Sequence, residues 1–204
     1  MQPMDADPLN AWRKAERTRL VAARVAVGAE TIRIWREAID ATLLARFGAR
    51  LGTGVLALCW PIRNEYDARH VGRALRARGA VTAMPVVVAP RAPLVFREWR
   101  PGTVMAKGAM DIPYPVRARE VVPDAVLLPM NGWDAAGYRL GYGGGFFDRT
   151  LAAAATRPLV IGVSYELARM QTIHPQPWDI PVDWVVTEAG AYRRNDAGWL
   201  ERAA

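Results

Sequence analysis

The segment Arg139-Leu140-Gly141-Tyr142-Gly143-Gly144-Gly145-Phe146-Phe147-Asp148-Arg149 is the most informative stretch of this 204-residue chain. Four glycines within five residues carry no Cβ, so the backbone can turn its N–H groups toward an anion at close range. Residues 146–155 read as a helix, and its positive N-terminal end would point into the loop. Arg139 and Arg149 add positive charge, and Asp148 offers an oxygen ligand for Mg²⁺. The segment therefore predicts a site for a polyphosphate and a metal ion.

The loop matches neither of the two common nucleotide-binding motifs. Phe146 stands where the dinucleotide fingerprint needs its third glycine, and no Gly-Lys-Ser/Thr ending follows as in a Walker loop. The alternative is a glycine-rich turn that only lets a strand and a helix pack closely. The flanking arginines and the aspartate favour the anion site over that alternative.

The surrounding residues resemble a known family. The pattern Arg-Leu-Gly-x-Gly-x-Gly-aromatic-aromatic-Asp-Arg, preceded by Pro129 and Trp133-Asp134, is similar to the signature of the 5-formyltetrahydrofolate cyclo-ligases, also called 5,10-methenyltetrahydrofolate synthetases. The resemblance covers nearly the whole chain, including an early basic helix, Asn64-Glu65, and residues 178–183 followed by 185–188. Several blocks in the right order are a more specific signal than one loop.

The resemblance implies an activity and a set of site residues. The expected reaction is the ATP- and Mg²⁺-dependent closure of 5-formyltetrahydrofolate to 5,10-methenyltetrahydrofolate, with release of ADP and phosphate after the formyl oxygen is phosphorylated. The catalytic residues implied are Arg139 and Asp148. The ATP-binding residues implied are Arg13, Lys14, Arg17, Arg139, Leu140, Gly141, Tyr142, Gly143, Gly144, Gly145, Phe146 and Phe147. The folate-binding residues implied are Trp60, Glu65, Tyr142 and Phe146, and the Mg²⁺ ligands are Asp148 and Asp179.

Two parts of this assignment have ordinary alternatives. Arg13 and Arg17 share one face of a helix and Lys14 lies beside them, which is also typical of a solvated charged face. The family usually has a lysine where Arg13 stands, so Arg13 and Lys14 both remain candidates for the ATP contact. Glu65 is also placed where an acidic residue commonly begins a helix. Many family members carry two further cations in the glycine loop, which this chain lacks. The alternative function is therefore that of a noncatalytic relative that binds a folate or a nucleotide.

The bulk properties agree with a small-molecule enzyme. The formal charge of +7 favours anionic partners, but the arginines are scattered among acidic residues, so nucleic-acid binding is not expected. No apolar run approaches the roughly 20 residues that cross a bilayer, and residues 1–10 lack the apolar centre of a signal peptide. Cys59 is the single cysteine and is expected in the core. A monomeric, cytoplasmic protein without a membrane partner follows as an expectation.

The hydrophobic pattern predicts one α/β domain over residues 1–204, a three-layer α/β/α sandwich with a mostly parallel sheet and a small antiparallel hairpin. The expected long helices are 9–27, 30–47 with Gly48 as C-cap, 68–78 and 146–155. The expected strands are 54–60, 81–88, 94–99, 125–129, 159–165 and 184–187. Strand 184–187 is expected to be the last, with a frayed tail after Tyr192. Pro85 predicts an edge position or a break in its strand. Residues 100–123 are loop-rich and suit a lid or substrate wall, with surface packing as an equal alternative.

Overall fold

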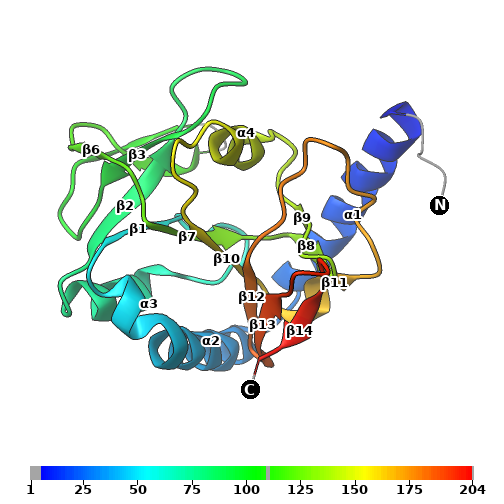
Figure 1. Ribbon diagram of the computed structural model, residues 1–204, viewed down its shortest axis with the longest axis horizontal. Coiled ribbons are helices and arrows are strands. Elements are labelled where there is room, and N and C mark those ends of the chain that lie inside the picture. Colours follow the sequence, from blue (N-terminus) through cyan, green and yellow to red (C-terminus); the bar gives the residue numbers. More distant parts are fainter. Residues whose placement is uncertain (1–5, 109–110, 204) are drawn as a thin grey trace.

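A mixed nine-stranded sheet runs through the centre of the computed structural model, which describes residues 6–108 and 111–203 (Figure 1). The strands of this sheet are β1 (Val55–Leu58), β2 (Val81–Val86), β3 (Val95–Glu98), β6 (Glu120–Val121), β7 (Ala125–Pro129), β10 (Leu159–Val163), β12 (Trp184–Thr187), β13 (Gly190–Arg194) and β14 (Leu200–Arg202). The helices are α1 (Ala6–Val25), α2 (Ala29–Leu51), α3 (Arg69–Arg76), α4 (Phe146–Ala152) and the 3₁₀ helix η2 (Glu166–Ala168). Small strands outside this sheet are β4 (Met105–Lys107), β5 (Pro113–Pro115), β8 (Gly132–Asp134), β9 (Arg139–Leu140) and β11 (Arg169–Met170).

The predicted three-layer architecture is confirmed. Figure 1 shows α2 and α3 on one side of the sheet and α4 on the other. Ile39 and Leu43 of α2 are fully buried in one apolar core, and Leu151 of α4 packs into a second core with Val160 and Trp133. Because helices cover both faces, the central strands β7 and β10 read as continuous apolar runs and not as alternating patterns.

The order of the parallel strands determines where a ligand can bind. The five central strands are parallel and lie in the order β2-β1-β7-β10-β12. The chain leaves β1 toward β2 and then returns to the other side of β1 as β7, so the connections diverge between β1 and β7. In open α/β sheets, ligands bind in the crevice outside the carboxyl ends of the strands at such a point.

The second helix is longer than the sequence indicated. α2 continues through Gly48 to Leu51, and Gly52 is the C-cap, with its N–H donating to the carbonyl of Gly48. The prediction of Gly48 as a C-cap is therefore wrong. A Cβ built at Gly48 would lie 2.3 Å from a guanidinium nitrogen of Arg78. This glycine makes room for a neighbouring side chain and does not end the helix.

The C-terminal part of the sheet contains more strands than the sequence indicated. β13 pairs antiparallel with β12, and β14 pairs antiparallel with β13, so 184–187 is not the last strand. The backbone turns at Gly190, whose φ of +138° is one that residues with a Cβ rarely adopt. The residues after Tyr192 therefore form part of a hairpin rather than a frayed tail.

At Pro85 the strand has a local edge position and no break, because β2 continues through this residue to Val86. β2 is an interior strand, but its pairing with β1 runs only from Val81 to Ala83, and Pro85 pairs with Phe96 of β3 alone. The predicted antiparallel hairpin between β2 and β3 is confirmed. Residues 100–123 contain the β4–β5 hairpin and the short edge strand β6, while residues 109–110 lie outside the described part. Among the described helices, none combines the length and the hydrophobicity that crossing a membrane requires.

Candidate active site

A cavity of about 760 Å³ opens at the carboxyl ends of β1, β2 and β7. Cys59 and Trp60 follow β1, Val87 follows β2, and Leu128 and Pro129 end β7; all five line the cavity. The position agrees with the divergence of the connections between β1 and β7. Every residue that the sequence assigned to the site lines this cavity except Lys14, which is exposed on α1.

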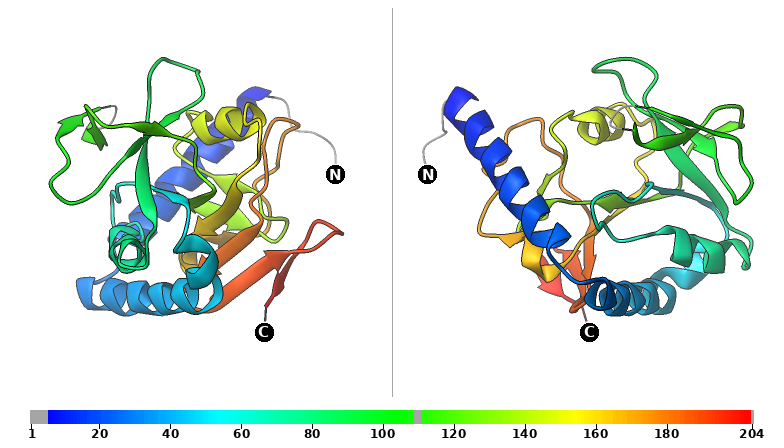
Figure 2. Two further views of the ribbon diagram at one scale, coloured as in Figure 1. Left: turned by 60° about the vertical axis from the view of Figure 1, so that its left-hand side comes forward. Right: turned by 180° about the vertical axis from the view of Figure 1, so that it is seen from behind.

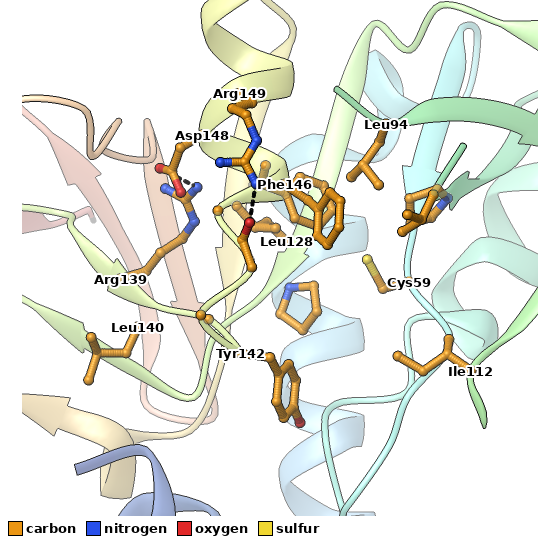
Figure 3. Close-up of a pocket in the computed structure, with 18 of the residues that line it drawn as sticks. Cys59, Leu94, Ile112, Leu128, Arg139, Leu140, Tyr142, Phe146, Asp148 and Arg149 are labelled. Atoms are coloured by element: carbon orange, nitrogen blue, oxygen red, sulfur yellow. Dashed lines mark hydrogen bonds and ion pairs between the residues drawn. The ribbon is translucent and has the colours of Figure 1, made fainter. Parts of the chain in front are cut away.

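The glycine loop forms one wall of the cavity. Gly143 and Gly145 have φ angles of +91° and +61°, which residues with a Cβ rarely adopt, and Gly145 precedes the first residue of α4. Arg149 folds back over the loop, where its guanidinium donates to the carbonyl of Gly144 and lies 5.6 Å from the centre of the Phe146 ring (Figure 3). The loop therefore presents bare backbone and a cation to the same space.

Two arginine–aspartate pairs lie at the polar end of the cavity. Arg139 donates to Oδ1 of Asp148 at 2.9 Å, and Arg13 donates to Oδ2 of Asp179 at 2.6 Å. Figure 3 shows the side chain of Arg139 directed at that of Asp148. Arg17 also lines this end, through a 2.9 Å hydrogen bond to the carbonyl of Gly141. With Arg149, four arginines surround two carboxylates, a balance that suits a polyanion.

The two aspartates have matching hydrogen-bond patterns. Besides its arginine, Asp148 accepts the N–H of Ile180 at 3.1 Å on Oδ1, and Asp179 accepts the N–H of Gln176 at 2.7 Å on Oδ2. Among the hydrogen bonds of the described residues, none uses Oδ2 of Asp148 or Oδ1 of Asp179. Each aspartate thus keeps one oxygen of a fixed carboxylate for another partner.

This pair fits Mg²⁺ better than a metal that needs a complete protein cage. Within residues 6–108 and 111–203, no group of three or more His, Cys, Asp or Glu side chains could hold a metal ion. Mg²⁺ is commonly bound by one or two carboxylates, with water and substrate phosphates completing its coordination. Asp148 and Asp179 are therefore the residues that could hold it.

A second polar cluster surrounds Glu65 on another wall of the cavity. Its Oε2 accepts the N–H of Ile62 at 3.0 Å, and its Oε1 accepts the hydroxyl of Tyr142 at 2.9 Å. Arg24 lies 3.7 Å from the same Oε1. Burial raises the pKa of Glu65, against the opposing effects of Ile62, Arg24 and Tyr142. Burial and the nearby Glu65 also raise the pKa of Tyr142 to about 12, so its hydroxyl keeps its proton.

Arg24 is a site residue that the sequence analysis missed. Only 3% of it is exposed, and its guanidinium donates to the carbonyl of Arg63, to Oδ1 of Asn131 and to the hydroxyl of Tyr142. In the sequence it is one of several arginines in a charged helix. Its spacing of seven residues, two helical turns, from Arg17 was the available signal, because it places both on one face.

The rest of the cavity is largely apolar. Its lining there includes Met84, Leu94 and Phe146, and the β4–β5 hairpin contributes Pro113 and Tyr114. From the described part of residues 100–123, the cavity is lined by Gly108, Ile112, Pro113 and Tyr114, so this stretch supplies part of one wall. The lining side chains at this end are Cys59, Met84, Val87, Leu94, Ile112, Pro113, Tyr114, Leu128 and Phe146. The cavity thus combines a charged end with an end suited to a flat ring system.

Cys59 and Trp60, which follow β1, both line the cavity. Cys59 was expected in the core but lines the cavity, and burial raises the pKa of its thiol, so it remains protonated. Trp60 lines the cavity as predicted, and the guanidinium of Arg69 lies 4.2 Å from the centre of its ring system. That contact fixes the tryptophan as a rigid wall.

The chain is similar in sequence to curated bacterial proteins. A curated 5-formyltetrahydrofolate cyclo-ligase of Mycolicibacterium smegmatis is 35% identical over 135 residues, which are 62% of this chain and 70% of that protein. The Escherichia coli protein of the same name is 32% identical over 102 residues, covering 46% of this chain and 55% of that protein.

Solved structures give the same result. The NMR structure of Aquifex aeolicus 5,10-methenyltetrahydrofolate synthetase superposes with a TM-score of 0.76 at 26% identity, covering 94% of this chain and 95% of that one. A synthetase from Mycoplasma pneumoniae, at 20% identity, shares the fold with a TM-score of 0.71 over 86% of this chain and 98% of that one. The profile of the 5-formyltetrahydrofolate cyclo-ligase family matches residues 9–188. This chain therefore belongs to the 5-formyltetrahydrofolate cyclo-ligase family of enzymes.

Proposed function

We propose that the protein uses ATP and Mg²⁺ to convert 5-formyltetrahydrofolate to 5,10-methenyltetrahydrofolate, with release of ADP and phosphate. The observation that carries this proposal is that one cavity contains both parts that the reaction needs. The glycine loop and the two arginine–aspartate pairs form its charged end, and Trp60, Glu65 and apolar side chains form the other walls. ATP and a reduced folate would therefore meet in one space.

The chemistry calls for phosphate transfer between the two substrates. The formyl oxygen attacks the γ-phosphorus of ATP, so ADP leaves and an N-linked formyl phosphate forms. N10 of the folate then attacks the formyl carbon, loses its proton, and phosphate departs with the former formyl oxygen. The ring closes as the methenyl cation. Such a reaction requires positioning and charge neutralisation, and no covalent bond to the protein.

The charged end has residues for both tasks. We propose that the backbone of Gly141 to Gly145 surrounds the phosphates, while Arg17 and Arg149 contact them. Arg13 and Arg139 keep their bonds to the aspartates and add positive charge behind them. Lys14 points to the exposed side of α1, so between the two neighbouring cations Arg13 is the better candidate for this site.

We assign the free carboxylate oxygens to the metal. Oδ2 of Asp148 and Oδ1 of Asp179 would bind Mg²⁺, which supplies neutralisation of the phosphate charge when bound. Arg139 and the N–H of Ile180 orient Asp148, and Arg13 and the N–H of Gln176 orient Asp179. Partners of this kind fix the direction of a metal ligand.

Glu65 is proposed to receive the folate. Its carboxylate faces the cavity from the wall next to Trp60, and a carboxylate can accept the N–H groups at one edge of a pterin ring. Phe146 and Trp60 offer flat surfaces for the ring.

We also propose a monomer in the cytoplasm, with no nucleic acid or membrane as partner.

The test follows product and oxygen atoms. Mixing the protein with 5-formyltetrahydrofolate, ATP and Mg²⁺ should produce the absorbance of methenyltetrahydrofolate, and omission of ATP should abolish it. With an ¹⁸O-labelled formyl oxygen, the label should appear in the released phosphate. Unlabelled phosphate would exclude the formyl phosphate. Intact binding of both substrates without any product would instead support the noncatalytic relative.

A further inference from the structure

We infer that Tyr142 is a positioning residue that connects the glycine loop to Glu65, so that nucleotide and folate strengthen each other's binding. The inference rests on the proposed function, because it assigns the phosphates to the loop and the folate to Glu65. It adds a mechanism by which one half of the cavity affects the other.

The hydrogen bonds around Tyr142 have a fixed direction. An arginine can only donate, so the tyrosine oxygen accepts from Nη2 of Arg24 at 3.2 Å. The tyrosine proton is then available for Oε1 of Glu65 at 2.9 Å. Arg24 also lies 3.7 Å from that oxygen, so the half-buried phenol joins the buried carboxylate and guanidinium in one group. The orientation of Glu65 consequently depends on where the tyrosine hydroxyl lies.

Tyr142 belongs to the part of the loop that would bind phosphate. It stands between Gly141, whose carbonyl accepts Nε of Arg17, and Gly143, whose φ is +91°. Its ring points away from Asp148 and Arg139, toward the other wall of the cavity (Figure 3). When backbone N–H groups on either side of Tyr142 bind phosphate, the position of its hydroxyl is fixed with them. The residue thus faces both substrates, through its backbone and its side chain.

The group around Arg24 does not satisfy all its hydrogen-bonding groups. Asn131 accepts from Arg24 through Oδ1, but its Nδ2 is buried without a partner among the described residues. A buried donor without a partner is unfavourable. A loop position that supplied this donor with a partner would be favoured, so a ligand that shifts the loop can change this group. Ligand-dependent rearrangement of this kind is what energetic coupling between two sites requires.

The experiment measures coupling directly. The Kd of 5-formyltetrahydrofolate is determined by calorimetry with and without a non-hydrolysable ATP analogue and Mg²⁺, for the parent protein, Tyr142→Phe and Tyr138→Phe. Tyr138 lies four residues earlier and does not line the cavity, so its variant is a matched loss of a hydroxyl. In the parent and in Tyr138→Phe, the nucleotide should lower the folate Kd by about 5-fold or more, a usual size for coupling. In Tyr142→Phe the aromatic ring and the Kd of the nucleotide should be retained. The ratio of the folate Kd without nucleotide to the folate Kd with nucleotide should fall toward one.

Two results would overturn the inference: an undiminished ratio in Tyr142→Phe, or a parent protein in which the nucleotide leaves the folate Kd unchanged. Steady-state kinetics keep this outcome separate from failure of the proposed function. If the parent forms product but Tyr142→Phe keeps the parent's ratio, only the inference fails. If the parent forms no product but binds both ligands with coupling, and Tyr142→Phe loses that coupling, the proposed reaction fails and the role of Tyr142 stands.

Discussion

The guanidinium of Arg13 donates a 2.6 Å hydrogen bond to the carboxylate of Asp179, a residue 166 positions later in the chain. The same side chain donates to the carbonyls of Ile173 and His174. Figure 2 shows the first helix and the segment from 171 to 183 side by side. One arginine therefore attaches α1 to the loop that supplies a proposed metal ligand. It acts as a structural clamp and as a source of charge.

Replacing Arg13 with lysine should destabilise the protein. Lysine keeps the charge but cannot reproduce the planar set of donors that reaches three oxygens. Loss of a buried hydrogen bond to a charged group costs about 1.5–3 kcal/mol, and we expect Tm to fall by at least about 3 °C. Arg19→Lys is the matched control, since Arg19 forms an exposed pair with Glu16 on the same helix. Thermal unfolding followed by circular dichroism gives both values. Equal Tm values for the two variants would refute the clamp.

Replacing Asp148 with asparagine should remove turnover while the fold is kept. Asparagine can still accept from Arg139 and Ile180 through its oxygen, but it loses the negative oxygen proposed for Mg²⁺. Removing one group that stabilises a transition state typically lowers kcat by about 10²–10³-fold. Asp183→Asn is the control, because Asp183 pairs with Arg157 at 2.9 Å outside the cavity. Near-parental kcat in Asp148→Asn would remove this residue from the mechanism.

The glycine loop was predictable from sequence because its chemistry is local. Glycines, arginines and an aspartate within eleven consecutive residues are close in any fold, and the structure places all of them on one cavity. The central strands were predictable for a similar reason, since β7 and β10 are uninterrupted apolar runs between polar segments. Local sequence patterns therefore indicated both the fold class and the main site.

The parts that could not be predicted depend on contacts between distant segments. Gly48 reads as a helix end until Arg78 is known to pack against it. Arg24 reads as a surface cation until Arg63, Asn131 and Tyr142 surround it. The spacing of Arg24 from Arg17 indicates a shared helix face, but it does not reveal which distant segment covers that face.

Folate binding should weaken in acid because of Glu65. Burial raises its pKa, and the ionised form is the one that accepts N–H groups, so the KM for 5-formyltetrahydrofolate should rise as pH falls through that raised pKa. The charged or titratable groups that face this carboxylate include Arg24, Arg63, Tyr142, Cys59 and Tyr165. Glu65→Gln has no carboxyl group to titrate at this position. Dividing its KM by the parental KM at each pH therefore cancels the pH effect that comes from titration of the substrate itself. A ratio constant from pH 7 down to about 4.3, the usual pKa of a glutamate, would contradict this role.

The last prediction separates the loop's binding role from its role in folding. A Cβ built at Gly141 meets nothing within 4 Å, and its φ is not among the positive ones, so Gly141→Ala should fold normally and can gain about 0.4–1 kcal/mol. The new methyl group lies on a residue that lines the cavity, where the phosphates are proposed to approach the backbone. We therefore expect an unchanged or higher Tm with a KM for ATP raised about tenfold or more, equivalent to about 1.4 kcal/mol of lost binding. Gly28→Ala, equally unobstructed but at the start of α2, should leave the KM for ATP unchanged. Unaltered ATP kinetics in Gly141→Ala would mean that the phosphates do not approach the loop at this residue.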